Sequence, residues 1–116
     1  MAKSYIKINN YSNNGSLFIA SKVFKDIAIE KLKTTSGVVL GLTPDKKGRA
    51  QDYDFDKNIT VNYKDGNAEL YIVINVQKGI DVNKLCIELQ KEILEEISIL
   101  LEQVSVQIKI KVANII

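Results

Sequence analysis

One stretch of the sequence constrains the fold more than any other feature: apolar residues recur with helical spacing and are followed directly by alternating apolar and polar residues. Between Asp81 and Val112, apolar residues first recur every three or four positions, which is the spacing of one helix face. Apolar and polar residues then alternate, as in a half-buried strand. Asp81 is placed to cap the helix. The predicted inward positions are Val82, Cys86, Leu89, Ile93, Ile97 and Leu100 in the helix and Val104, Val106, Ile108, Ile110 and Val112 in the strand.

The same helix carries more apolar surface than one sheet requires. Ile87, Leu94 and Leu101 form a flanking stripe at intervals of seven residues, and Ile99 lies outside both stripes. Packing against another helix accounts for most of this surface, and self-association would account for the rest. Both interpretations stay open at the level of the sequence.

A β-hairpin precedes this helix, and its register follows from its turn. Asp65-Gly66 is a strong two-residue turn signal, and a slip by one residue would separate the apolar residues that face each other across it. The expected pairs are Ile59 with Ile72, Val61 with Leu70, and Tyr63 with Ala68. A helix of about 20 residues matches a strand of about nine residues in length, so the last strand should return parallel to the hairpin through a right-handed crossover.

The first half of the chain predicts a smaller unit of the same kind. We expect a strand from Leu17 to Ala20, a helix from Lys22 to Lys33 capped by Ser21, a left-handed exit at Gly37, and a strand from Val38 to Leu42. The inward residues of this helix are predicted to be Val23, Phe24, Ile27 and Ala28. Tyr5 to Ile8 could add a short edge strand, and Thr43 to Lys57 follows no regular pattern.

These segments together predict an α+β fold in which residues 1–116 form a single domain. The expected order is strand, helix, three strands, helix, strand (β-α-β-β-β-α-β). Both helices should lie on one face of a single mixed β-sheet.

No group of side chains in the sequence predicts a reactive centre. The chain contains no histidine, which removes the usual general base. Its single cysteine, Cys86, is on the predicted core side, so neither an internal disulfide nor a zinc site is expected. The alternating aspartates of residues 52–56 lack the glycine and glutamate that an EF-hand would need at Lys57 and Tyr63. We therefore predict no enzymatic activity, no catalytic residues, no cofactor and no metal site.

The N-terminal part of the sequence is polar and rich in asparagine. Met1 to Asn14 lacks the apolar core of a secretory signal, and the longest apolar runs are far shorter than the roughly 20 residues of a membrane span. We expect a soluble cytoplasmic protein, with any membrane association peripheral at the inner face.

A set of residues follows an order and spacing known from one protein family. The set comprises Gly15, Ile19, Val23, Ile27, Ala28, Gly37, Val38, Val61, Val76, Gly79, Val82, Leu85, Leu89, Gln90, Ile93 and the alternating strand from Val106 to Val112. In this order it resembles the alkaline shock protein, or envelope stress response, family of Gram-positive-type bacteria, over roughly residues 15 to 115. The chain departs from the family at residues 98–103, where members often have a Thr-Gly turn.

The resemblance implies a small non-enzymatic protein linked to cell-envelope homeostasis. Some members sit at the cytoplasmic side of the membrane through a separate anchoring partner, and some accompany a fatty-acid or dihydroxyacetone-type kinase. We therefore expect an interaction or scaffold protein that acts through a protein partner, which could itself be membrane-anchored. Self-association and a kinase-accessory role remain alternatives.

The candidate interaction surface is the face of the sheet that points away from the helices. Tyrosine and valine among long polar side chains could form a binding patch, or the face could simply be a solvent-facing sheet. Its residues are Thr60, Tyr71, Val73, Asn75, Gln107, Lys109 and Lys111. Nucleic-acid binding is an alternative function, which the net charge of +2 neither favours nor excludes. The basic residues available for it are Lys46, Lys47, Arg49, Lys109 and Lys111.

Overall fold

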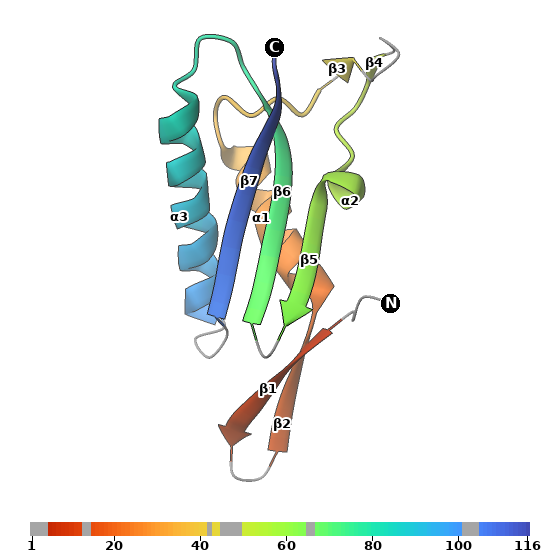
Figure 1. The fold of residues 1–116 in the computed structure, drawn as a ribbon, viewed down its shortest axis with the longest axis vertical. Coiled ribbons are helices and arrows are strands. Elements are labelled where there is room, and N and C mark those ends of the chain that lie inside the picture. Colours follow the sequence, from red (N-terminus) through yellow and green to blue (C-terminus); the bar gives the residue numbers. More distant parts are fainter. Residues whose placement is uncertain (1–4, 13–14, 42, 45–49, 65–66, 101–104) are drawn as a thin grey trace.

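The main body of the protein is a mixed three-stranded β-sheet. Figure 1 shows the computed structural model, which describes residues 5–12, 15–41, 43–44, 50–64, 67–100 and 105–116. Strands β5 (Ile59–Lys64) and β6 (Asn67–Val76) are antiparallel, whereas β6 and β7 (Ser105–Ile115) are parallel, in the order β5-β6-β7. The predicted α+β class with a single mixed sheet in the body is confirmed.

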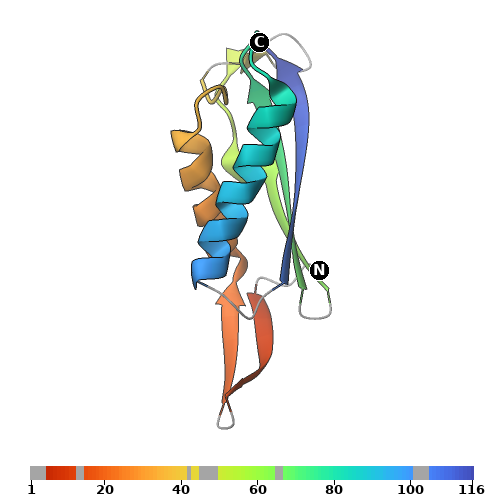
Figure 2. The same cartoon turned by 90° about the vertical axis from the view of Figure 1, so that its left-hand side faces the viewer.

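Two long helices, α1 (Ser21–Thr34) and α3 (Val82–Leu100), cover the same face of this sheet, as expected (Figure 2). Helix α3 connects the parallel strands β6 and β7, as the matched lengths predicted. The helix begins after Asp81, whose Oδ1 accepts a hydrogen bond from the Lys84 backbone N–H at 3.1 Å. The predicted Asp81 cap is therefore confirmed.

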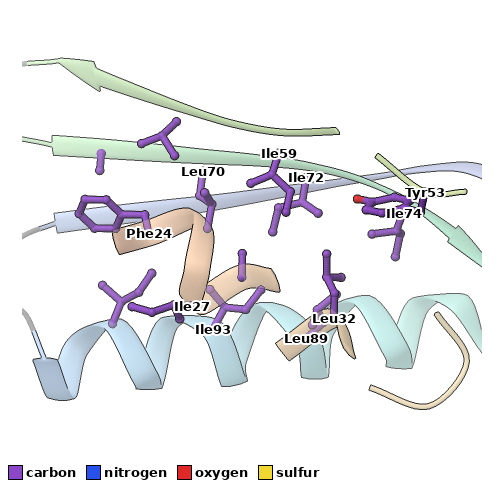
Figure 3. Packing of buried hydrophobic residues seen from close by; sticks show 14 of the residues in the cluster. Phe24, Ile27, Leu32, Tyr53, Ile59, Leu70, Ile72, Ile74, Leu89 and Ile93 are labelled. Atoms are coloured by element: carbon purple, nitrogen blue, oxygen red, sulfur yellow. The ribbon is translucent and has the colours of Figure 1, made fainter. Parts of the chain in front are cut away.

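The core lies between the helices and the sheet (Figure 3). On this face Leu70, Ile72 and Ile74 of β6 are at most 1% exposed, and Leu89 and Ile93 of α3 are fully buried. The hairpin has the predicted register, with Ile59 opposite Ile72, Val61 opposite Leu70, and Tyr63 opposite Ala68.

Several inward positions in the helices differ from the sequence prediction. In α1 the predicted core residue Val23 is 38% exposed, whereas Leu32 is buried. In α3 Leu85 is buried, and the predicted core residues Val82 and Cys86 are only half-buried. Neighbouring apolar residues of a helix cannot all point inward, so the surface that the helix meets decides which of them does.

The start of α1 also differs from the prediction. Ser21 is the first helical residue, and Ala20, which has no side-chain acceptor, occupies the N-cap position. The predicted Ser21 cap is therefore wrong by one position. At the other end, Gly37 has a φ of +97°, as expected for a left-handed exit, and a Cβ there would come within 2.8 Å of Leu85 Cδ1.

Two predicted strands lie outside the main sheet. The segment around Leu17 to Ala20 is a strand, β2 (Gly15–Ala20), but among the described strands it pairs only with β1 (Tyr5–Ser12), in a separate hairpin at one end of the body (Figure 1). The predicted strand from Val38 to Leu42 is reduced to one bridge, between Val38 and Val76, and Leu42 is outside the described residues. The separate hairpin lengthens the molecule: its radius of gyration is 15.7 Å, against about 13 Å for a compact domain of this length.

The irregular stretch from Thr43 to Lys57 contains short elements. Strands β3 (Thr43–Pro44) and β4 (Ala50–Gln51) pair with each other, and a four-residue helix, α2 (Phe55–Asn58), follows. The Asp54 side chain caps α2 by accepting from the Lys57 backbone N–H at 3.2 Å. Within the described residues, no helix combines the length and the apolar character needed to cross a membrane.

We expect α3 to tolerate a change at Ile99 but not at Ile93. Ile93 is fully buried and Ile99 is 74% exposed on the same helix. Ile93→Ala should lower the free energy of unfolding by about 2–5 kcal/mol, because it leaves a cavity between α3 and the sheet. The matched variant Ile99→Ala should change it by less than about 0.5 kcal/mol. Denaturant titration measures both values, and equal losses in the two variants would refute this packing.

Candidate interaction surface

The candidate residues lie in rows across the face of the sheet opposite the helices. Tyr71 pairs with Thr60 on β5 and with Lys109 on β7, so these three form one row. Val73 pairs with Lys111 in the next row. Side chains alternate between the two faces of a sheet, so the burial of the intervening β6 residues in the core sends this set outward.

Most of this face is accessible. Tyr71 is 39% exposed, Val73 is half-buried, and the side chains of Thr60, Gln107, Lys109 and Lys111 are exposed. Figure 2 shows both long helices on the other side of the sheet. The structure thus brings these candidate residues together on one open face of the sheet.

Asn75 is an exception, because it is buried at 8% exposure. Its side-chain Oδ1 accepts a hydrogen bond from Asn114 Nδ2 at 2.9 Å, and its backbone carbonyl accepts from the Val39 N–H at 2.8 Å. The register between β6 and β7 shifts at this point: Val112 pairs with Ile74, Asn114 pairs with Asn75, and Ala113 is the extra residue. Asn75 is therefore a structural residue, and its prediction as part of the accessible surface was wrong.

Tyr53 is a structural residue that the sequence analysis did not identify. It is buried at 8% exposure, its hydroxyl donates to the Val73 carbonyl, and its ring packs edge-on against Phe55 at a centroid distance of 5.1 Å. It covers β6 beyond Ile72, where the pairing with β5 ends. The sequence of residues 52–56 could have indicated that Tyr53 is buried, because aromatic residues occupy the positions between the exposed aspartates.

The charges on the open face are partly paired. Lys109 Nζ lies 3.2 Å from Glu69 Oε1, and both side chains are about half exposed. Lys111 lies one row further along β7. The other basic candidates for nucleic-acid binding, residues 46, 47 and 49, are outside the described residues. The described structure therefore places two of the five basic candidates on one strand, one of them in an ion pair.

Burial favours the neutral forms of two tyrosines and of the cysteine. Burial raises the pKa of Tyr53 to about 12, with a smaller contribution from the nearby Asp54 charge. Burial also raises the pKa of Tyr63 to about 12, against a smaller opposing effect of the Ser21 hydroxyl, and raises the pKa of the Cys86 thiol. A neutral phenol or thiol is a poor nucleophile. Among the described residues, no three His, Cys, Asp or Glu side chains are grouped to hold a metal ion.

Comparison with known proteins gives few matches. No known protein family and no curated protein matches the chain. Similar solved structures include a MamM CTD in a copper form and a second MamM CTD, with TM-scores of 0.42 and 0.43. Both are 11% identical to this chain, and each match covers 78% of this chain and 95% of the other. These values are too low to assign the chain to a family.

We expect the folded state to lose stability as the pH rises from about 10 to about 12. Tyrosine in the unfolded chain ionises near its ordinary pKa of 10.0, whereas the folded-state pKa of Tyr53 and Tyr63 is about 12. Their stabilising contribution is therefore complete below pH 10 and is lost as the pH rises through the folded-state pKa.

Tyr53→Phe removes one of these two groups, so its loss of stability above pH 10 should be smaller than in the wild type. At neutral pH the variant should be less stable by about 1 kcal/mol, because the Val73 carbonyl loses its hydrogen bond. Denaturant titration at a series of pH values gives the difference between the two curves, in which the lysine contributions cancel. A constant difference up to pH 12 would contradict this assignment.

The hydrogen bond between Asn75 and Asn114 should also contribute measurably to the stability of the folded state. Asn114→Ala removes the donor to the buried Asn75 side chain and should lower the free energy of unfolding by about 1 kcal/mol. Asn62→Ala is the control, because Asn62 is exposed, and it should change stability by less than about 0.5 kcal/mol. Equal effects of the two substitutions in denaturant titration would show that the hydrogen bond is dispensable.

Proposed function

We propose that this chain is a non-catalytic interaction protein that binds a protein partner through the open face of its sheet. The observation that carries the proposal is the row formed by Thr60, Tyr71 and Lys109, with an exposed tyrosine at its centre. Tyrosine offers a large amphipathic contact area at a low cost in conformational entropy and is enriched at interfaces. The adjacent lysine and glutamine side chains would supply the polar rim of such a contact.

The biological role that we propose is cell-envelope homeostasis, by analogy with the alkaline shock family that the sequence resembles. In support, some of the residues that carry the resemblance have defined positions in this fold. Gly79 has a φ of +90° in the turn before α3, and Gln90 Nε2 donates to the Ile108 carbonyl at 2.8 Å, which links α3 to β7. The partner that we propose is a cytoplasmic protein or one anchored at the inner face of the membrane.

A docking role also agrees with the chemistry of the described side chains. Tyr53, Tyr63 and Cys86 are held in their neutral forms, and the aspartates of residues 52–56 are exposed. These groups suit packing and solvation better than proton transfer or nucleophilic attack.

Capture of a partner by the tagged full chain tests this proposal. We expect the wild type to retain a specific protein from membrane or cytosol fractions, identified by mass spectrometry. Tyr71→Ser should reduce capture about tenfold or more, since residues at the centre of an interface carry most of its energy. Lys111→Glu should also reduce capture, because it reverses a charge at the rim and slows association. Lys84→Glu is the matched control for the lysine, because Lys84 is an exposed residue of α3, and it should leave capture unchanged.

Equal capture by all variants would place the partner elsewhere on the molecule and contradict the proposal. Salt-sensitive binding of RNA or DNA in a gel-shift assay, weakened by Lys111→Glu, would favour the nucleic-acid alternative instead.

A further inference from the structure

The open face of the sheet carries two lysines directly beside two apolar side chains. Lys109 and Lys111 are successive outward residues of β7, about 6.6 Å apart along the strand, and both are exposed. The parallel register places Tyr71 of β6 next to Lys109, and Val73 next to Lys111. These four residues, which we call the lysine patch, therefore combine positive charge on one strand with apolar surface on the neighbouring strand.

An internal carboxylate already pairs with one lysine of the patch. Glu69 lies opposite Gln107, one row before Tyr71 and Lys109, and its Oε1 is 3.2 Å from Lys109 Nζ. Both side chains are about half exposed, so water weakens this ion pair. Among the outward residues of β5, β6 and β7 that the structure describes, Glu69 is the only one with a negative charge. A carboxylate from outside can therefore replace Glu69 at Lys109 at little cost.

We propose that the lysine patch binds an acidic segment of a partner protein, which presents two carboxylates and an apolar side chain on one side. One carboxylate pairs with Lys111, the other replaces Glu69 at Lys109, and the apolar side chain packs on Tyr71 and Val73. Carboxylates at positions i and i+2 of a strand lie about 6.6 Å apart, and those at i and i+4 of a helix about 6 Å apart, so both match the spacing of the lysines. The inference rests on the proposed docking function and names the chemistry of its partner.

The composition of the patch favours a protein over a nucleic acid. A phosphate backbone is bound by a series of cations along its length. The described part of the open face instead has two lysines, and the Glu69 carboxylate beside one of them would repel phosphates. Tyr71 and Val73 make the other half of the patch apolar, which an apolar side chain covers and a sugar-phosphate backbone does not.

Glu69 makes the sign of the charge effect specific to an acidic partner. Glu69→Gln removes the competing carboxylate, releases Lys109 and makes the patch more positive. The substitution should therefore strengthen the binding of an acidic segment and speed its association. A basic partner would bind the variant more weakly, and a purely apolar partner would bind both forms equally. One substitution thus separates the three kinds of partner.

Fluorescence anisotropy with a labelled synthetic peptide tests the proposal on the full chain. The probe is a helical peptide of about 18 residues, with glutamates at positions i and i+4 and leucine at i+3. A control peptide has glutamine in place of both glutamates. We expect the glutamate peptide to bind about tenfold more tightly than the control at about 20 mM salt, and this difference should shrink as the salt concentration rises.

Matched variants of the protein assign the effect to the patch. Glu69→Gln should tighten the binding of the glutamate peptide about two- to fivefold, and Lys109→Gln combined with Lys111→Gln should weaken it about tenfold. Glu88→Gln and Lys84→Gln make the same changes of charge at exposed residues of α3, and each should leave the affinity unchanged. Circular dichroism verifies that every variant is folded.

Equal affinity for the two peptides, no tightening in Glu69→Gln, or no binding of the glutamate peptide at about 100 µM protein would each overturn the proposal. A single-stranded oligonucleotide that binds more tightly than the glutamate peptide, and is weakened by the double lysine variant, would also overturn it and favour a nucleic acid. These outcomes do not affect the capture experiment. A partner that the wild type captures and Tyr71→Ser does not would keep the docking function even if the acidic segment is refuted.

Discussion

The buried layer between the sheet and its two long helices is the contact on which the rest of the structure depends. β6 is the central strand, and its residues Leu70, Ile72 and Ile74 belong to the same buried cluster as residues of both helices. The helix residues include Phe24 and Leu32 of α1 and Leu89 and Ile93 of α3. α3 spans the length of β6, so the chain can only return as a parallel strand, and β7 occupies that position. The hairpin partner β5 and the helix α1 then complete the sheet and cover the same face.

This contact also determines which side chains the protein presents. Because side chains alternate along a strand, the burial of Leu70 and Ile72 forces Tyr71 to the opposite face, and the parallel register brings Lys109 beside it. The register of β6 with its neighbouring strands therefore determines both which side chains enter the core and which lie on the open face. The same arrangement leaves β7 less covered, because the inward side of β6 is completely buried beneath the two helices and that of β7 is only half-buried.

The sequence predicted the parts of the fold that depend on local patterns. The hairpin register followed from Asp65-Gly66 and the α3 boundary from Asp81, and both are confirmed in the described residues. The choice of partner strand is not local: β2 pairs with β1 instead of entering the sheet, and the segment after Gly37 makes one bridge to Val76. No periodicity within either segment contains that information.

The candidate surface was predictable for the same reason. Its prediction was wrong at Asn75, where the register between β6 and β7 shifts. Thr60, Tyr71 and Lys109 share a row because alternation continues undisturbed through them. At Asn75 the bulge at Ala113 brings Asn114 alongside, and the segment after Gly37 covers the strand, so an asparagine expected at the surface becomes buried. A bulge depends on pairing across strands that are far apart in the sequence.

Native-state amide hydrogen exchange tests the central role of the layer between the helices and the sheet most directly, because it reports the free energy at which each segment opens. The account predicts that the amides of β6 and α3 exchange together and only through global unfolding, while those of the β1–β2 hairpin exchange through local opening at a lower free energy. Exchange of β6 and α3 at clearly different free energies, or protection of the hairpin equal to that of β6, would contradict it.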